Sequence, residues 1–310
     1  MKGRGKDMDG KTPVISPIAI GEAGRAARAV VAVSDGRFPE RCDIAVSASR
    51  IGGVEVRAAS VRGLSHRHYG TVRQDEYTVV ATPDDRWVVA ALADGVSSGA
   101  YSHLAAEIVT RTACAVLTEE LARNHPADIE WGPVLRTLAD EVRGCAAERF
   151  GARDDREASV LMATTGLFAV VAAEPDARGH RVAFVVSVGD TSAWVLRPSA
   201  EPAWLPLQAV KNHDAAVASS ATDAIPLVPD GPVPVITAEL TGDEVLVLMT
   251  DGVGDPLGAG AGEVGESLAT AWRTPPYAMA FAAEVDFARK SFDDDRTVVG
   301  IWPVPDSAER

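Results

Sequence analysis

The sequence predicts an α+β fold of four layers, an α-β-β-α sandwich in which two central antiparallel β-sheets pack face to face. Two observations support this prediction. Segments typical of β-strands occur in groups, and helical segments with one apolar face separate these groups along the chain. Each sheet must also bury its outer face, and amphipathic helices supply the cover. The length of 310 residues fits a single domain of this type.

The first part of the chain contains four apolar or alternating segments, which predict two β-hairpins. A glycine pair and a proline-aspartate turn stand between the partners, as is usual for hairpin connections. The predicted strands are residues 43–46 with 54–57, joined at 52–53, and residues 77–82 with 87–92, joined at 83–85.

Two amphipathic helices are predicted next. Ser102 can cap a helix that ends near residue 123, because apolar side chains recur there on one face at helical spacing. A second helix is predicted over residues 131–150. We expect both apolar faces to pack on a sheet rather than to form a binding groove.

The second half of the chain returns to strands and closes with a helix and a last strand. The order of these elements completes the predicted sandwich. The predicted strands are residues 159–172, 180–188, 193–197, 244–249 and 297–302, and the helix is residues 262–287.

Two segments lack a regular pattern. Residues 1–25 combine charge, Gly and Pro without periodicity, which predicts a disordered leader before a domain over residues 26–310. Residues 198–239 are rich in Pro, Ala and Asp and are predicted to form a mobile flap beside the functional site.

The charge and the apolar pattern exclude several classes of partner. The net charge is −14 with no basic stripe, so neither nucleic acid nor an anionic membrane surface is expected. No apolar run approaches the roughly 20 residues of a membrane helix, and the N-terminus lacks a signal-peptide pattern. We therefore expect a cytoplasmic protein. Cys42, Cys114 and Cys145 show no metal-type spacing and are expected to stay unpaired.

Four aspartates stand at the ends of apolar strands. Asp94 closes WVVAALADG, Asp190 closes VSVGD, Asp251 closes VLVLMTDG, and Asp294 opens DDRTVVGIW. An unpaired carboxylate at such a place is costly to desolvate, and several that converge repel one another unless cations join them. Oxygen ligands suit Mg or Mn, and the lack of clustered His and Cys argues against zinc. The pattern predicts a divalent metal site.

The order of six segments between residues 54 and 302 resembles a known family. The segments are GLSHRHYGTVRQDEY, LADGVSSGAYSHLAAE, ATTGLFAVV, VSVGDTSAWVL, LMTDGVGD and DDDRTVVGIW. In this order they resemble the metal-dependent protein phosphatases of the type 2C class, most closely their compact bacterial branch. The resemblance implies the same α-β-β-α sandwich.

The resemblance also implies roles for individual residues. Asp94 would bridge two metal ions, and the carbonyl of Gly95 would bind one of them. Asp251 and Asp294 would complete the shell of the other ion. Asp75, in RQDEY, matches an acidic residue that acts through metal-bound water.

Asp190 matches a position that helps to hold a weaker third ion, so two or three Mn or Mg ions are expected. The metal-site loop departs from the pattern, because it is DGVSSGAYSH where many relatives have two glycines and a His after Asp-Gly. Ser97 and Ser98 are predicted to cap the following helix instead.

The phosphate-binding residue is a second departure. Many relatives have an Arg shortly before the acidic pair, where this chain has SHRHYGTVRQD. His66, Arg67 and Arg73 are candidates to bind phosphate. His66 ranks first, because Ser65-His66 resembles the SH of the compact bacterial branch.

These expectations favour an Mg- or Mn-dependent phosphatase of phosphoserine and phosphothreonine in proteins, which uses a metal-bridging water and no covalent intermediate. The expected partner is a protein substrate that a Ser/Thr kinase has phosphorylated. The protein itself is expected to be a monomer. A catalytically weak regulatory module that binds a phosphoprotein is the alternative, and a phosphatase of small molecules is a third. No glycine-rich phosphate loop with Lys and Ser or Thr is present.

Overall fold

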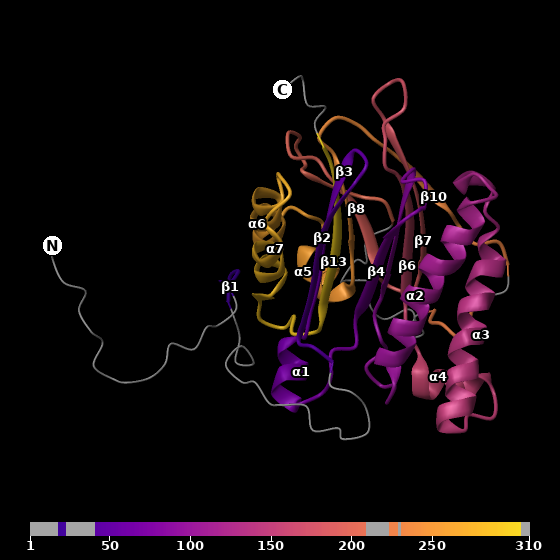
Figure 1. Ribbon diagram of the computed structural model, residues 1–310. Coiled ribbons are helices and arrows are strands. Elements are labelled where there is room, and N and C mark those ends of the chain that lie inside the picture. The colour runs from indigo at the N-terminus through magenta and orange to yellow at the C-terminus, as the bar shows by residue number, and fades with distance from the viewer. Residues whose placement is uncertain (1–17, 23–40, 209–222, 229–230, 305–310) are drawn as a thin grey trace, which may run out of the picture.

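The computed structural model describes residues 18–22, 41–208, 223–228 and 231–304, and these form the predicted four layers (Figure 1). Two antiparallel sheets stand face to face in the middle. Helices α2 and α3 cover one outer face, and α5, α6 and α7 cover the other. The prediction of an α-β-β-α sandwich is confirmed.

Each sheet contains strands that are distant in sequence. The five-stranded sheet has the order β10-β7-β6-β5-β4, and the six-stranded sheet has the order β2-β3-β13-β11-β8-β9. The strands of the first sheet are β4 (Glu76–Ala81), β5 (Trp87–Ala93), β6 (Gly166–Ala172), β7 (Arg181–Val188) and β10 (Ile236–Leu240). Those of the second are β2 (Ile44–Ile51), β3 (Val54–Val61), β8 (Ser192–Leu196), β9 (Trp204–Pro206), β11 (Val245–Met249) and β13 (Arg296–Pro303).

Strand β5 shows why a continuous apolar run is needed at the centre of a sandwich. All of its residues are buried, because the two faces of the strand contact different apolar clusters. Val88, Ala90 and Leu92 pack between the two sheets, whereas Val89 and Ala91 pack toward helices α2 and α3. A strand covered on both faces has no exposed polar side.

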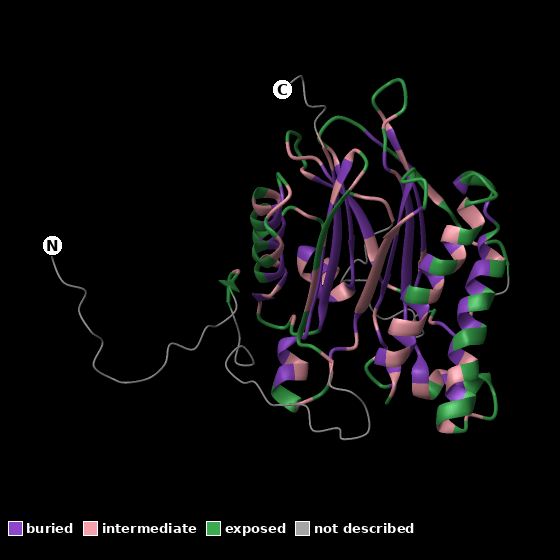
Figure 2. Cartoon of the chain, viewed as in Figure 1, coloured by how far each residue is buried: buried purple, intermediate pink, exposed green. Residues whose placement is uncertain are grey.

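The helices bury one stripe each and expose the opposite stripe, as Figure 2 shows for α2 and α3. This is the expected pattern for helices that cover a sheet. The bounds are α1 (Leu64–Tyr69), α2 (Ser102–Leu121), α3 (Trp131–Phe150), α4 (Asp155–Met162), α5 (Asp251–Leu257), α6 (Glu263–Ala271) and α7 (Ala278–Val285), with a 3₁₀ turn at Pro126–Asp128.

Large aromatic side chains fill the layer beneath α5, α6 and α7. Trp194, Trp204, Trp272 and Trp302 are all buried there with Phe281. The indole nitrogen of Trp204 donates to the Gly265 carbonyl at 2.9 Å, and that of Trp302 donates to the Trp272 carbonyl at 2.8 Å. The polar atom of each of these two indoles is therefore satisfied, and the rings supply the buried area that the short helices lack.

Two predicted elements differ from the structure. Residues 159–162, predicted as strand, end helix α4, and β6 begins only at Gly166. The Asp154 side chain caps α4 by accepting from the Glu157 amide at 2.8 Å, and this local start signal outweighs the apolar run that follows. The predicted last helix is two helices, α6 and α7, because Pro275 and Pro276 lie between them.

Further elements were not predicted. Helices α1 and α5 are short, β9 lies within the predicted flap, and β10 overlaps its end. Ser102 is the first residue of α2 rather than its cap, and its buried hydroxyl has no hydrogen-bond partner. Helix periodicity located α2 correctly, whereas the cap was assigned from residue type alone.

Part of the predicted leader pairs with the domain. Strand β1 (Ile18–Ala19) lies parallel to β12 (Phe287–Ala288). Residues 1–17, 23–40 and 209–222 are outside the described residues, which leaves out most of the predicted leader and only part of the predicted flap. Within the described ranges, the three cysteines are free and no helix is both long and apolar enough to span a membrane.

Candidate metal centre

Asp94 follows β5 directly, and hydrogen bonds to the start of β6 hold its backbone. Its amide donates to the Thr165 hydroxyl at 3.1 Å. Its carbonyl accepts from the Thr165 amide and from the Thr164 hydroxyl, both at 2.8 Å. These three bonds fix the chain where the strand ends, so the side chain lies at the edge of the core.

Asp190 and Asp251 join Asp94 from two other strand ends. Asp190 comes after β7, where Gly189 adopts a φ of 98°, a value that favours glycine. Asp251 comes after β11 and begins α5. One carboxylate oxygen of each of the three residues lies within 4.8 Å of the others. Strands from both sheets thus contribute to one cluster of ligands.

Asp294 lines the same cavity of about 430 Å³ as Asp94, Asp190 and Asp251. Its side chain is 52% exposed, so it reaches the open side of the cavity. Gly95 also lines the cavity, and a Cβ there would come within 2.9 Å of the Ser102 backbone. The five residues predicted to hold metal are therefore brought together.

The loop that carries Asp294 packs against two glycines. A Cβ on Gly63 would lie 2.3 Å from the Asp294 carbonyl carbon, and one on Gly252 would lie 1.9 Å from the Asp295 carbonyl oxygen. Only glycine permits such close approach of one backbone to another. Gly252 follows Asp251, so the two strand ends that supply Asp251 and Asp294 are in direct backbone contact.

Asp295, which the sequence analysis did not select, holds the loop of Asp294 in place from its buried side. Its side chain is 1% exposed and accepts from the Gly63 amide at 2.6 Å and from the Gln74 amide. Burial alone would raise the pKa of Asp295, but the bond from His66 and those from the two amides lower it below its ordinary value. Asp295 is therefore a buried, charged anchor.

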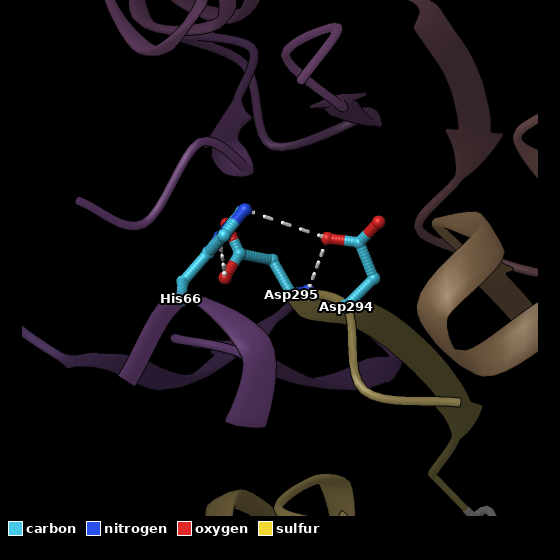
Figure 3. A group of neighbouring side chains, drawn as sticks. All are labelled: His66, Asp294 and Asp295. Carbon is cyan, nitrogen blue, oxygen red and sulfur yellow. Dashed lines mark hydrogen bonds and ion pairs between the residues drawn. The ribbon is translucent and has the colours of Figure 1, made fainter. Parts of the chain in front are cut away.

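His66 faces both neighbouring aspartates, with one ring nitrogen toward each carboxylate (Figure 3). Its Nδ1 is 2.8 Å from Asp295 Oδ1, and its Nε2 is 3.9 Å from Asp294 Oδ1. Burial opposes the charged imidazole, but Asp295 and then Asp294 raise the pKa of His66. His66 does not line the cavity defined above, so it reaches that cavity through Asp294.

Burial and repulsion raise the pKa of the clustered carboxyls. Desolvation, followed by repulsion from Asp75, raises the pKa of Asp94 well above its ordinary value. Desolvation raises the pKa of Asp251 to about 6, and repulsion from Asp294 adds to this effect, although a hydrogen bond with Asp94 opposes it. Without cations the cluster therefore favours bound protons, which metal binding would displace.

The donor set fits divalent cations. Asp251 Oδ1 is buried and has no hydrogen-bond partner among the described residues. A buried, unpaired carboxylate oxygen is costly unless a cation or a proton neutralises it. The ligands within reach are aspartate oxygens, which suit Mg²⁺ or Mn²⁺ better than Zn²⁺.

Asp75 lies next to the cavity but does not line it. It is 1% exposed, and the Thr250 hydroxyl donates to its Oδ2 at 2.7 Å. Burial, followed by repulsion from Asp295, raises the pKa of Asp75 well above its ordinary value. Asp94 and Asp251 also interact electrostatically with it.

The arginines near the predicted phosphate site have other partners. Arg67 pairs with Asp286 at 2.8 Å and is 8% exposed. Arg73 is 3% exposed and donates to the Ser60 hydroxyl and the Asp75 carbonyl. Neither guanidinium lines the cavity, so the structure gives no support to the two arginines as phosphate ligands.

The prediction that Ser97 and Ser98 cap helix α2 is wrong. The helix begins at Ser102, and Tyr101 occupies its cap position without a side-chain hydrogen bond. Ser97 and Ser98 line the cavity instead. The loop is longer than the cap prediction assumed.

A model of the family described as protein phosphatase 2C matches residues 62–282. This chain belongs to that family. The match includes Asp75, Asp94, Asp190 and Asp251 and ends before Asp294. A search of curated proteins by sequence gives no significant match.

Solved phosphatase structures share the fold. A bacterial serine phosphatase superposes with a TM-score of 0.56 at 14% identity, covering 80% of this chain and 97% of that one. A serine/threonine phosphatase of S. agalactiae gives 0.52 at 14%, with coverage of 84% and 99%. The catalytic domain of PstP, solved with two manganese ions, gives 0.50 at 16%, with coverage of 81% and 98%. At these identities the likeness concerns the fold.

Sequence reasoning missed the residues that position the ligands. Thr165 holds the backbone of Asp94, Thr250 binds Asp75, and Asp295 anchors the Asp294 loop. Thr250 and Asp295 each adjoin a predicted ligand, which is the only local signal for them. Thr165 lies in ATTGLFAVV, and only the pairing of β5 with β6 brings it to Asp94.

Proposed function

We propose that the protein is an Mg²⁺- or Mn²⁺-dependent phosphatase that hydrolyses phosphoserine and phosphothreonine in proteins. The observation that carries this proposal is the cavity in which Asp94, Asp190, Asp251 and Asp294 converge from both sheets. Membership of the phosphatase 2C family supports it, as does the fold shared with a manganese-bound phosphatase.

The chain's own residues would hold two cations, and a third through Asp190. Asp94 is the ligand that two cations would share. One of its carboxylate oxygens lies within 4.8 Å of those of Asp190 and Asp251, and Asp294 lines the same cavity. Gly95 would add its carbonyl. Divalent cations supply a water of lowered pKa and neutralise charge that develops on the phosphoryl group.

Asp75 and His66 complete the proposed machinery. The buried Asp75 carboxyl lies beside the cavity and interacts electrostatically with Asp94 and Asp251, so it would act on metal-bound water from behind these ligands. We assign His66 first to positioning, because it joins Asp295 to Asp294. Its contact with the phosphoryl group stays a prediction.

Substitution of His66 by alanine is expected to lower activity about tenfold, since the bond that orients Asp294 and Asp295 is lost. If His66 acts by positioning, the Mn concentration for half-maximal activity rises. His66→Asn keeps a donor toward Asp295 and should recover most of this loss. A rise in KM alone, with unchanged Mn dependence, would instead place the imidazole on the phosphoryl group.

The proposal is tested by assaying the purified chain on an aryl phosphate and on a phosphothreonine peptide. Hydrolysis of both is expected with Mn²⁺ or Mg²⁺ and not after treatment with EDTA, and Zn²⁺ should substitute poorly. Full activity of the metal-free protein would refute the metal-dependent mechanism. Activity on sugar phosphates but not on the peptide would favour the small-molecule alternative.

One observation favours the second candidate, a regulatory module that binds a phosphoprotein without turning it over. No Lys or Arg is among the described residues that line the cavity, so phosphate affinity would depend on the metals. Peptide binding without hydrolysis in the same assay would select this candidate. A cytoplasmic location, a monomeric state and a partner Ser/Thr kinase stay predictions.

A further inference from the structure

The cavity has a second wall that is neutral. The loop between β5 and α2 contributes Ser97 and Ser98 to this wall, and helix α4 contributes Ser159 and Val160. The aspartates described above line the same cavity. All charged residues that line the cavity in the described part of the chain are acidic.

The loop is held on both sides of the two serines. The Val96 amide donates to the Ala163 carbonyl at 3.0 Å, and the Tyr101 amide donates to the Leu161 carbonyl at 2.9 Å. A further bond joins the Gly99 amide to the Val96 carbonyl at 2.9 Å. These bonds fix the loop against the end of α4, so its position does not depend on a ligand.

The donors between these bonds are unused. Across the described residues, neither the amide nor the hydroxyl of Ser97 or Ser98 makes a hydrogen bond, and the Ser159 hydroxyl makes none. Both loop serines are exposed. Amide and hydroxyl donors of this kind must bind water or a ligand. Ser97, Ser98 and Ser159 all line the cavity, and together they carry five donors without a partner among the described residues.

We propose that Ser97, Ser98 and Ser159 bind the phosphoryl oxygens of the substrate and so replace the cationic side chain that the described cavity lacks. This inference rests on the proposed phosphatase function. Hydrogen bonds from neutral donors to a charged oxygen are strong, and they add no positive charge that would compete with the cations for the aspartates. The two candidate arginines do not line the cavity, and Arg67 and Arg73 are themselves buried with partners of their own.

The test compares Ser97→Ala/Ser98→Ala with the parent protein, both loaded with Mn²⁺. The double variant should raise KM for an aryl phosphate about tenfold, the scale of one hydrogen bond to a charged group, while kcat changes less. The inhibition constant for inorganic phosphate should rise by a similar factor. Mn²⁺ affinity, measured by calorimetry, should stay at the parent value.

Two further variants control the result. Ser97→Thr/Ser98→Thr keeps both hydroxyls and should restore most of the affinity. Ser49→Ala removes an exposed serine of β2, which does not line the cavity, and should behave as the parent.

Unchanged KM and unchanged phosphate inhibition in the double alanine variant would overturn the inference. So would a loss of Mn²⁺ affinity that explains the whole effect, because the loop would then act through the metals. If the parent itself shows no hydrolysis, the proposed function fails, but calorimetric binding of inorganic phosphate to the Mn²⁺-loaded protein still decides the role of the serines.

Discussion

Replacing Asp94 by asparagine is expected to lower the rate of phosphoester hydrolysis at least about 100-fold, the loss seen when a key electrostatic group is removed. A carboxylate oxygen of Asp94 lies within 4.8 Å of one from Asp190 and one from Asp251, and Asp94 lines the same cavity as Asp294. Asparagine keeps the shape of the side chain but removes the negative charge that cations would share. The measurement is kcat/KM on an aryl phosphate at saturating Mn²⁺.

The same substitution should not unfold the protein. The raised pKa of Asp94 shows that its ionised form is unfavourable in the metal-free fold, so a neutral amide should leave the metal-free melting temperature unchanged or higher. Mn²⁺ should then raise that temperature less than in the parent. Asp128→Asn changes an exposed aspartate away from the cavity and serves as the control. Parent-level activity in Asp94→Asn would remove it from the metal site.

Replacing Asp295 by alanine is expected to lower the free energy of unfolding by about 3 to 5 kcal/mol, the usual cost of removing one partner of a buried charged pair. The substitution leaves the Gly63 and Gln74 amides and the His66 imidazole without their acceptor. Those groups cannot regain water while they stay buried. Denaturant unfolding of the metal-free protein measures the change.

Activity should fall together with stability, because Asp295 holds the backbone next to Asp294. Asp293→Ala is the matched control: it removes an exposed aspartate of the same run that does not line the cavity. Its stability should stay within about 0.5 kcal/mol of the parent value. If Asp295→Ala were equally mild, the hydrogen bonds to Asp295 would not be what fixes the loop.

Several elements were predictable from the sequence because their signals are local. Residues 131–150 have an apolar stripe at helical spacing, and helix α3 covers that range. The apolar run before Asp94 required a strand buried on both faces, and β5 is one. The wrong strand prediction for residues 159–162 also has a local cause. The run after residue 159 is apolar, but the cap at Asp154 keeps its first residues helical.

The candidate site was only partly predictable. The aspartates at strand ends predicted a metal site. The resemblance to type 2C phosphatases selected Asp294 from the three consecutive aspartates at 293–295. Nothing local distinguished Asp294, on the open side of the cavity, from Asp295, which is buried beneath it. The difference depends on Gly63 and Gln74, whose amides approach Asp295 from more than 200 positions away along the chain.

The longer strands, the main helices and the set of carboxylates that end the strands were predictable from local patterns, because burial on two faces and helical periodicity each show over a few residues. Which polar groups are free to act depends on the tertiary packing. Arg67 and Arg73 were chemically suitable for phosphate, yet their partners occupy them. Ser97 and Ser98 were expected as caps, yet their donors remain open at the cavity. Whether a polar group is used or free depends on which distant strands and loops pack beside it, and that information lies in the strand order of the two sheets.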